Sequence, residues 1–243
     1  TTSSAFVVDG IRRLKMAQFH FVEDYEKLVA TLIKQYPMDE AMSYAVGGAY
    51  DLFGQIEAHL LRQLGLADGM RLVDLGCGSG RLASALHRMA NVSYVGIDIV
   101  QALLDYAKTK APKYEFILHR DLSIPQKDAS ADMVSAFSLF THLLHAESYI
   151  YLEECVRVLK PGGKVVFSFL EFAEPGHWSI FVGTRNDTKA SAAPHLNMFI
   201  ERNAIATWAA NLGLVVDQFI SGGCPIWTGH ALGQTAVVLR KPA

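Results

Sequence analysis

The stretch LVDLGCGSGRLA, residues 72–83, decides the fold of this chain. It opens with a short apolar run, Leu72 to Leu75, that is typical of a buried parallel strand. Three glycines then alternate with other residues in a tight loop: Gly76, Gly78 and Gly80. Ser79 is expected to cap the helix that follows, because its hydroxyl can accept a hydrogen bond from an unpaired N–H of the first turn. Strand, glycine loop and helix in this order predict a nucleotide-type binding element.

The spacing of the glycines limits what the loop can bind. It reads G-x-G-x-G, and Arg81 stands where a dinucleotide fingerprint has its third glycine. Asp74 ends the strand just before the loop, where an anion is unfavourable beside a pyrophosphate but suits a positively charged ligand. S-adenosylmethionine is such a ligand, because it carries a sulfonium and an ammonium group and no phosphate. A purely structural strand-to-helix turn is the alternative, and the later strands must decide.

Composition narrows the class of protein. The 243 residues, 51% of them hydrophobic, are enough for one large α/β domain with a small addition. A net charge of −2 gives no electrostatic reason to expect nucleic acid or an anionic membrane as a partner. The cysteines show no metal-ligand spacing and no run spans a membrane, so we expect no metal, a cytoplasmic location, and a monomer or homodimer.

The order of apolar patterns predicts the architecture. Helices are expected at 9–36, 39–47 and 50–64. Residues 1–50 are expected to form an N-terminal helical cap or lid, with Tyr44 or Tyr50 reaching the ligand. Residues 51–243 then alternate between strands and helices and form the main domain, with strands expected at 72–75, 92–97, 114–118, 133–137, 164–170, 214–220 and 234–240. This predicts a Rossmann-like, doubly wound, seven-stranded, mostly parallel sheet with an antiparallel last strand.

Acidic residues recur at the ends of the expected strands, where ligands bind in open α/β sheets. Asp98 lies 22 residues after Gly76, the distance at which an acid meets a ribose, although a strand-end capping role is the alternative. Asp121 is placed to accept a hydrogen bond from an adenine amino group. Ile99 and Leu122, which directly follow these two acids, can pack against the faces of adenine.

These motifs together resemble those of class I S-adenosylmethionine-dependent methyltransferases of the small-molecule type. The segments that carry the resemblance are VDLGCGSG at 73–80, VGID at 95–98, Asp121, ADMVSAFSLFTHL at 131–143 and VLKPGGKVVFS at 158–168. The resemblance implies that Asp74 and the glycine loop, with Cys77, hold the methionine part of the cofactor and that Asp98 holds the ribose. It further implies an adenine contact from Asp121 and a backbone contact from Phe137, with S-adenosylhomocysteine as the product.

The acceptor side lies outside the shared motifs. A nucleophile that is protonated at neutral pH needs a base, and four residues after strands four and five or in the following insert are candidates: His142, His145, Glu171 and His177. A positional role is the alternative for His142. Residues 172–198 form a long irregular insert that, with the 221–233 loop, is expected to select the substrate. Trp178, Phe181, Phe199 and Trp227 are candidate walls of its pocket.

Three other functions compete with methyl transfer to a small molecule. A nicotinamide-dependent oxidoreductase is disfavoured by Arg81, and a non-catalytic cofactor-binding module leaves the three strand-end acids without a purpose. A nucleic-acid methyltransferase is disfavoured by the near-neutral charge and by the lack of an N-P-P-Y type sequence after strand four, where residues 137–140 read FSLF. The acceptor and its reacting atom, O, N or S, stay open.

Overall fold

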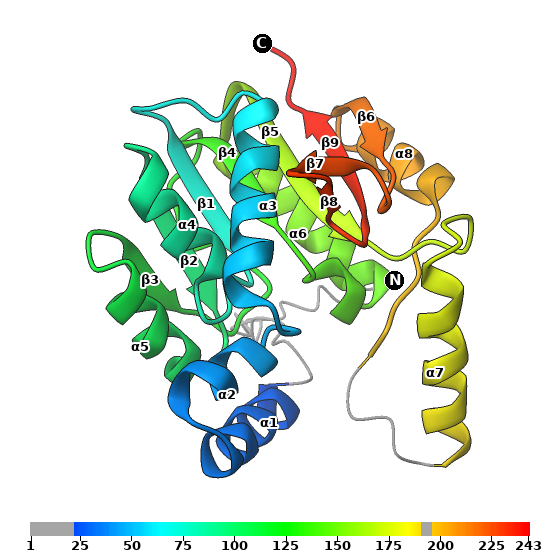
Figure 1. Ribbon diagram of the computed structural model, residues 1–243. Coiled ribbons are helices and arrows are strands. Elements are labelled where there is room, and N and C mark those ends of the chain that lie inside the picture. Colours follow the sequence, from blue (N-terminus) through cyan, green and yellow to red (C-terminus); the bar gives the residue numbers. More distant parts are fainter. Residues whose placement is uncertain (1–21, 191–195) are drawn as a thin grey trace, which may run out of the picture.

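One seven-stranded sheet organises the chain. The computed structural model describes residues 22–190 and 196–243. The strands of the sheet are β1 (Arg71–Leu75), β2 (Ser93–Asp98), β3 (Glu115–Leu118), β4 (Ala131–Ala136), β5 (Leu159–Phe169), β6 (Val215–Ile220) and β9 (Thr235–Arg240). Their order is β3-β2-β1-β4-β5-β9-β6, and β9 runs antiparallel to both of its neighbours while the other pairs are parallel (Figure 1). The predicted Rossmann-like fold is confirmed.

Helices cover both faces of this sheet. The layer helices are α3 (Tyr50–Gln63), α4 (Arg81–Met89), α5 (Gln101–Lys110), α6 (His145–Val158) and α8 (Arg202–Asn211). Alternation along β5 separates two cores, because successive side chains of a strand point to opposite faces. Val166 joins the core beneath α3 and α4, whereas Phe167 joins the core beneath α6 and α8. Strands buried on both faces explain why the sequence shows apolar runs rather than alternation.

The remaining helices gather at the edge where the parallel strands end (Figure 1). They are α1 (Val22–Gln35), α2 (Met38–Tyr44) and α7 (His177–Lys189), with a short 3₁₀ turn η1 (Phe140–His142) after β4. The part of the predicted first helix before Val22 lies outside the described residues. No helix within the two described ranges is long and apolar enough to cross a membrane.

Two segments that were predicted to be irregular contain regular structure, namely helix α7 and a small hairpin. Residues 177–189 are helical, and the hydroxyls of Thr184 and Thr188 donate to the carbonyls four residues earlier, so both hydroxyls are satisfied within the helix. The 221–233 loop contains β7 (Pro225–Trp227) paired with β8 (His230–Ala231). Trp227 stacks on His59 of α3, with ring centres 5.3 Å apart, so it closes the outside of α3 and does not line the pocket.

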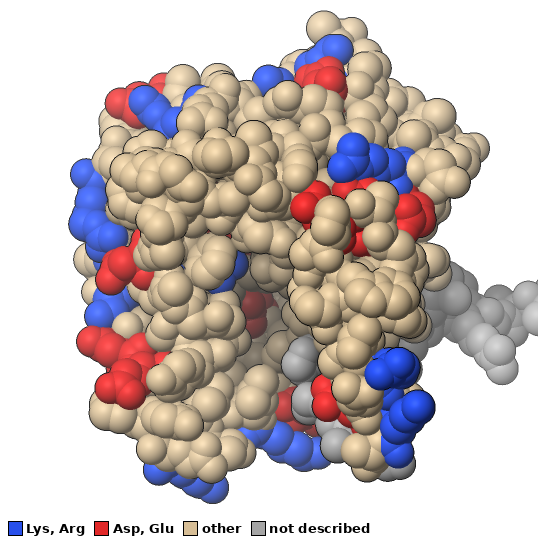
Figure 2. Space-filling view, turned by 45° about the vertical axis from the view of Figure 1, so that its right-hand side comes forward, with Lys and Arg blue, Asp and Glu red and all other residues tan. Residues whose placement is uncertain are grey.

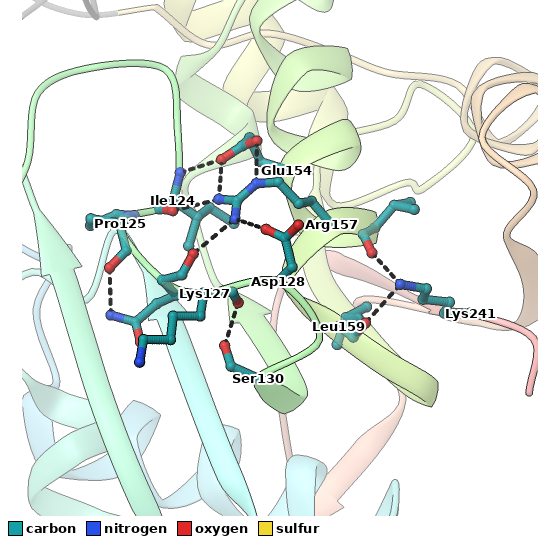
Figure 3. Close-up of polar contacts among 11 residues, drawn as sticks. Ile124, Pro125, Lys127, Asp128, Ser130, Glu154, Arg157, Leu159 and Lys241 are labelled. Carbon is teal, nitrogen blue, oxygen red and sulfur yellow. Dashed lines mark hydrogen bonds and ion pairs between the residues drawn. The ribbon is translucent and has the colours of Figure 1, made fainter.

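Arg157 fixes the loop that enters β4 (Figure 3). Its guanidinium donates to the carbonyls of Ile124 and Gln126 and pairs with Glu154 and Asp128. Glu154 in turn accepts a hydrogen bond of 2.8 Å from the Ile124 N–H. This network lies at the amino end of β4, opposite the edge where α1, α2 and α7 gather, and its role is to hold α6 to the sheet.

Glu171 and His177 hold the carboxyl end of β5. Glu171 is fully buried, and its carboxylate accepts hydrogen bonds from Arg202 at 2.7 Å and Thr235 at 2.7 Å. Burial alone would raise the pKa of Glu171, but the hydrogen bonds and charge of Arg202 bring it below its usual range. His177 is also fully buried, between the Glu171 backbone and the Gly233 carbonyl. These contacts join β5, α7, α8 and the start of β9.

We expect the change Arg202→Ala to lower the free energy of unfolding by roughly 2 kcal/mol, because it leaves the buried Glu171 carboxylate without its cation. The Arg202 side chain is 44% exposed, so water replaces part of the lost interaction. Chemical denaturation measures the effect. The matched control is Arg240→Ala, which breaks the more exposed pair with Asp217 and should cost under about 1 kcal/mol. Equal losses in the two variants would contradict this assignment.

Candidate functional site

A pocket of about 360 Å³ opens at the carboxyl ends of β1, β2 and β4. Its floor is the glycine loop with Asp74 and Asp98, and its opposite wall comes from α1, α2 and the residues just after α2. That wall is largely apolar and includes Leu28, Tyr44 and Val46. Figure 2 shows a hollow in the surface with acidic atoms at its depth and mostly uncharged walls. The volume suits a small organic ligand.

The backbone N–H groups of the glycine loop are used within the protein. The N–H groups of Gly76 and Cys77 both donate to the Ile97 carbonyl, at 2.8 and 3.1 Å, and that of Gly80 donates to the Cys77 carbonyl. The Gly78 N–H donates to the Asp98 carboxylate at 2.9 Å. A pyrophosphate site needs such groups pointing at the ligand. This loop therefore lacks those four donors for a phosphate.

The loop also receives the segment that follows α2. Gly78 has φ +55°, and a Cβ added there would lie 2.6 Å from Cγ1 of Val46, so only glycine allows Val46 to pack on the loop. The Ser79 hydroxyl donates to the Met42 carbonyl at 2.9 Å. Our prediction that Ser79 caps α4 is wrong, because Gly80 occupies the N-cap position and the Ser79 hydroxyl is turned toward α2. The Tyr50 hydroxyl donates to the Ser79 carbonyl, and Tyr50 does not line the pocket.

Two carboxylates, those of Asp98 and Asp74, line the pocket and differ in their hydrogen-bond donors. Asp98 accepts from the N–H groups of Gly78 and Val100, one on each oxygen, which leaves one lone pair per oxygen for a ligand. Burial raises the pKa of Asp98, and these backbone hydrogen bonds oppose the rise. Asp74 accepts from Tyr94 at 2.6 Å and Ser135 at 2.7 Å. Burial raises the pKa of Asp74 to about 7, despite these two hydrogen bonds.

A buried ion pair that the sequence analysis missed completes the floor. Glu57 of α3 is buried, and its carboxylate accepts a hydrogen bond of 2.8 Å from Nε of Arg81, which also donates to the Val46 carbonyl at 2.6 Å. Burial raises the pKa of Glu57, and Arg81 opposes the rise. The sequence pattern could have revealed this pair, because Glu57 falls on the inward-facing stripe of α3 with Phe53, Ile56 and Leu60. A buried acid requires a cation or donor nearby.

Some of the residues that were expected to contact the cofactor line the pocket, and others do not. Ile99 and Phe137 line the pocket, and so does Cys77, whose thiol pKa is raised by burial. Asp121 and Leu122 lie beside the pocket without lining it. His119, which the sequence analysis did not select, lines this end of the pocket, and Nε2 of its ring lies 2.7 Å from the Ser123 hydroxyl.

Of the four candidate bases, His142 alone lines the pocket. Nδ1 of His142 lies 2.7 Å from the Leu196 carbonyl, so Nδ1 carries the proton and Nε2 carries the lone pair in the neutral ring. His145 is exposed at the start of α6 and bonds the Phe199 carbonyl. Glu171 and His177 are held in the contacts at the end of β5. The structure does not bring these three together with His142 in the pocket.

Comparisons with known proteins agree with this geometry. The sequence profile of the family described as "Methyltransferase domain" matches residues 73–167. Ubiquinone biosynthesis O-methyltransferase of Coxiella burnetii is 27% identical over 152 residues, which cover 60% of this chain and 64% of that protein. The match thus spans less than two thirds of the length of this curated relative.

Solved structures share the fold. Magnesium protoporphyrin IX methyltransferase from Synechocystis PCC 6803, in a structure with bound S-adenosylhomocysteine, superposes with a TM-score of 0.61 at 15% identity, covering 83% of this chain and 86% of that one. A SAM-dependent methyltransferase from Aquifex aeolicus gives 0.57 at 17% identity, covering 87% and 97%.

Residues 73–167 match a methyltransferase domain, and the chain has the fold of class I S-adenosylmethionine-dependent methyltransferases.

The pocket of this methyltransferase-family chain fits the family cofactor. S-adenosylmethionine carries an ammonium and a sulfonium group, and the floor supplies the carboxylates of Asp74 and Glu57. Among the described residues that line the pocket, Arg81 is the one Lys or Arg that balances them. Its ribose has two hydroxyl donors, and Asp98 has two lone pairs to accept them. It has no phosphate, in agreement with the internal use of the loop N–H groups.

We expect cofactor affinity to rise with pH from 5.5 to about 7 and then to level off. Asp74, with a pKa of about 7, must lose its proton to pair with the ligand ammonium, so each unit below 7 should cost up to roughly tenfold in affinity. Titration calorimetry with S-adenosylhomocysteine at several pH values measures this. In Asp74→Asn, binding should be weaker and most of the slope lost. An unchanged slope in that variant would show that another group titrates.

Proposed function

We propose that this protein transfers the sulfonium methyl group of S-adenosylmethionine to a small, largely apolar acceptor. The observation that carries the proposal is the polarity of the pocket. Carboxylates of Asp74 and Asp98 face it, the glycine-loop N–H groups are used internally, and the opposite wall is apolar. Bound S-adenosylmethionine would supply an activated methyl group, so the protein mainly orients the reactants and excludes water.

The cofactor contacts follow from the charges of the floor. Asp74 would hold the ammonium group beside Gly76, Gly78 and Gly80, and Asp98 would accept both ribose hydroxyls. Ile99 and Phe137 would pack on the cofactor. Asp121, Leu122 and Tyr50 do not line the pocket, so contact with the cofactor would require them to move toward it, and Cys77 serves as a small residue of the loop.

The acceptor would lie against the wall formed by α1 and α2. Leu28 and Tyr44 supply apolar surface there, Leu139 lines the pocket from the segment after β4, and Tyr25 packs edge-on against His142 with ring centres 5.7 Å apart. Exclusion of water by these side chains strengthens electrostatic interactions with the nucleophile. Relatives named for ubiquinone biosynthesis and for magnesium protoporphyrin IX make a small-molecule acceptor the preferred class.

His142 is our candidate for the general base. The Leu196 carbonyl holds its Nδ1–H, so the imidazole can take the proton of an O, N or S nucleophile at Nε2. The imidazole would hold that proton, and bound S-adenosylmethionine would supply the methyl group that the nucleophile takes up. Glu171, His145 and His177, predicted as alternatives, are engaged in the contacts described above.

We expect His142→Gln to lower turnover by about 10²–10⁴-fold with the affinity for S-adenosylhomocysteine unchanged, because the variant removes only the proton acceptor. Transfer of tritium from methyl-labelled S-adenosylmethionine to a panel of phenols, amines and thiols measures turnover. His145→Gln is the matched control and should retain activity. If the wild type binds S-adenosylhomocysteine but the two variants turn over alike, the base assignment fails. If the wild type does not bind S-adenosylhomocysteine, the proposed function itself fails.

A further inference from the structure

Gln234, which lies just before β9, belongs to a polar group that the cofactor contacts do not use. Its Oε1 accepts a hydrogen bond of 2.6 Å from the Ser168 hydroxyl and lies 3.4 Å from the Ser138 hydroxyl. Ser168 also accepts the Ser138 N–H at 2.7 Å. Ser138 holds a left-handed backbone with φ +58°, a conformation that costs a non-glycine residue energy and recurs at functional sites.

The serines fix which way the Gln234 amide faces. The Ser168 hydroxyl is fully buried, and its proton needs an acceptor. The acceptor that the described residues offer is Oε1 of Gln234. The amide therefore directs its oxygen at the two serines and its NH₂ group away from them.

Gln234 borders open space. Gln234 lines both the main pocket and an adjoining cavity of about 130 Å³, whose other walls include Phe53, Arg81 and Leu232. Among the described residues, no hydrogen bond is formed by Nε2 of Gln234. An oriented amide donor thus borders the pocket with no protein partner in that part of the chain.

The position of Gln234 favours the acceptor over the cofactor as its ligand. The sheet order β2-β1-β4-β5-β9 places the start of β9 three strands beyond β1, or about 14 Å at the usual strand spacing. The ribose is assigned to the end of β2 and the methionine part to the loop after β1. Gln234 therefore reaches the pocket from the side opposite the ribose.

We propose that the Gln234 amide donates a hydrogen bond to an oxygen atom of the methyl acceptor. The acceptor is then a molecule that bears a carbonyl, carboxylate or hydroxyl oxygen close to its apolar part, and Gln234 selects for that oxygen. This inference rests on the proposed function, since it assigns the substrate of the same site.

The variant Gln234→Glu tests the NH₂ donor of Gln234 separately from its acceptor oxygen. It keeps an acceptor oxygen for both serines but replaces the NH₂ group with an oxygen that repels the ligand oxygen. Gln218→Glu, on the exposed part of β6, is the matched control because it makes the same charge change away from the pocket. Benzoate and acetophenone, whose oxygens only accept hydrogen bonds, serve as oxygen-bearing probes, and toluene serves as the probe without oxygen.

Calorimetric titration of each probe into the complex with S-adenosylhomocysteine tests the inference. We expect at least one oxygen-bearing probe to bind more tightly than toluene, and Gln234→Glu to weaken that probe roughly tenfold, with no effect of Gln218→Glu. Affinity for S-adenosylhomocysteine should stay unchanged in both variants.

Three results would overturn it while leaving the proposed function intact. The first is equal binding of all three probes to the wild type. The second is unchanged probe affinity in Gln234→Glu. The third is a loss of S-adenosylhomocysteine affinity in that variant, which would move Gln234 to the cofactor. Failure of the wild type to bind S-adenosylhomocysteine would instead contradict the proposed function.

Discussion

The hydrogen bond from the Gly78 N–H to the Asp98 carboxylate is the contact on which the site depends. It folds the glycine loop onto the end of β2, and the Ile97 carbonyl accepts hydrogen bonds from the two preceding N–H groups, those of Gly76 and Cys77. The loop therefore presents carboxylates and apolar surface to a ligand, in place of these N–H donors. Positive φ at Gly78, with Val46 packed where a Cβ would lie, lets the segment after α2 close the same loop from above. Ligand charge and pocket shape thus follow from one local constraint.

Much of the fold could be predicted because it depends on local patterns. Apolar runs such as 92–97 alternate with helical stripes such as that of α3, and this alternation implies a parallel sheet with helices on both faces. Two segments could not be predicted. Helix α7 contains Thr, Asn and Asp, which are weak helix formers, and its first residue, the buried His177, is held by contacts with the Glu171 backbone and the Gly233 carbonyl. The β7–β8 hairpin is held by Trp227 stacking on α3, a contact between residues distant in sequence.

The residues of the site likewise divide into those that the sequence could predict and those that it could not. Asp74, Asp98 and the glycine loop were predictable because a strand end sets their place in the sheet. The Glu57–Arg81 pair and the Gln234 amide depend on side chains that meet only after α3, α4 and β9 have packed. Glu171 illustrates the limit, since its place at a strand end predicted a base, yet Arg202 and Thr235 from later in the chain surround it. Position along a strand predicts what edge a residue reaches, and only packing determines which group it contacts there.

The central claim is that the glycine loop binds a cationic adenosyl ligand and that four of its N–H groups are engaged within the protein and so do not serve a pyrophosphate. Paired calorimetric titrations of the wild-type protein with S-adenosylhomocysteine and with NAD test it most directly. The account predicts saturable binding of S-adenosylhomocysteine and no detectable heat with NAD, since four loop N–H groups already have partners. Tight binding of NAD without a response to S-adenosylhomocysteine would contradict it.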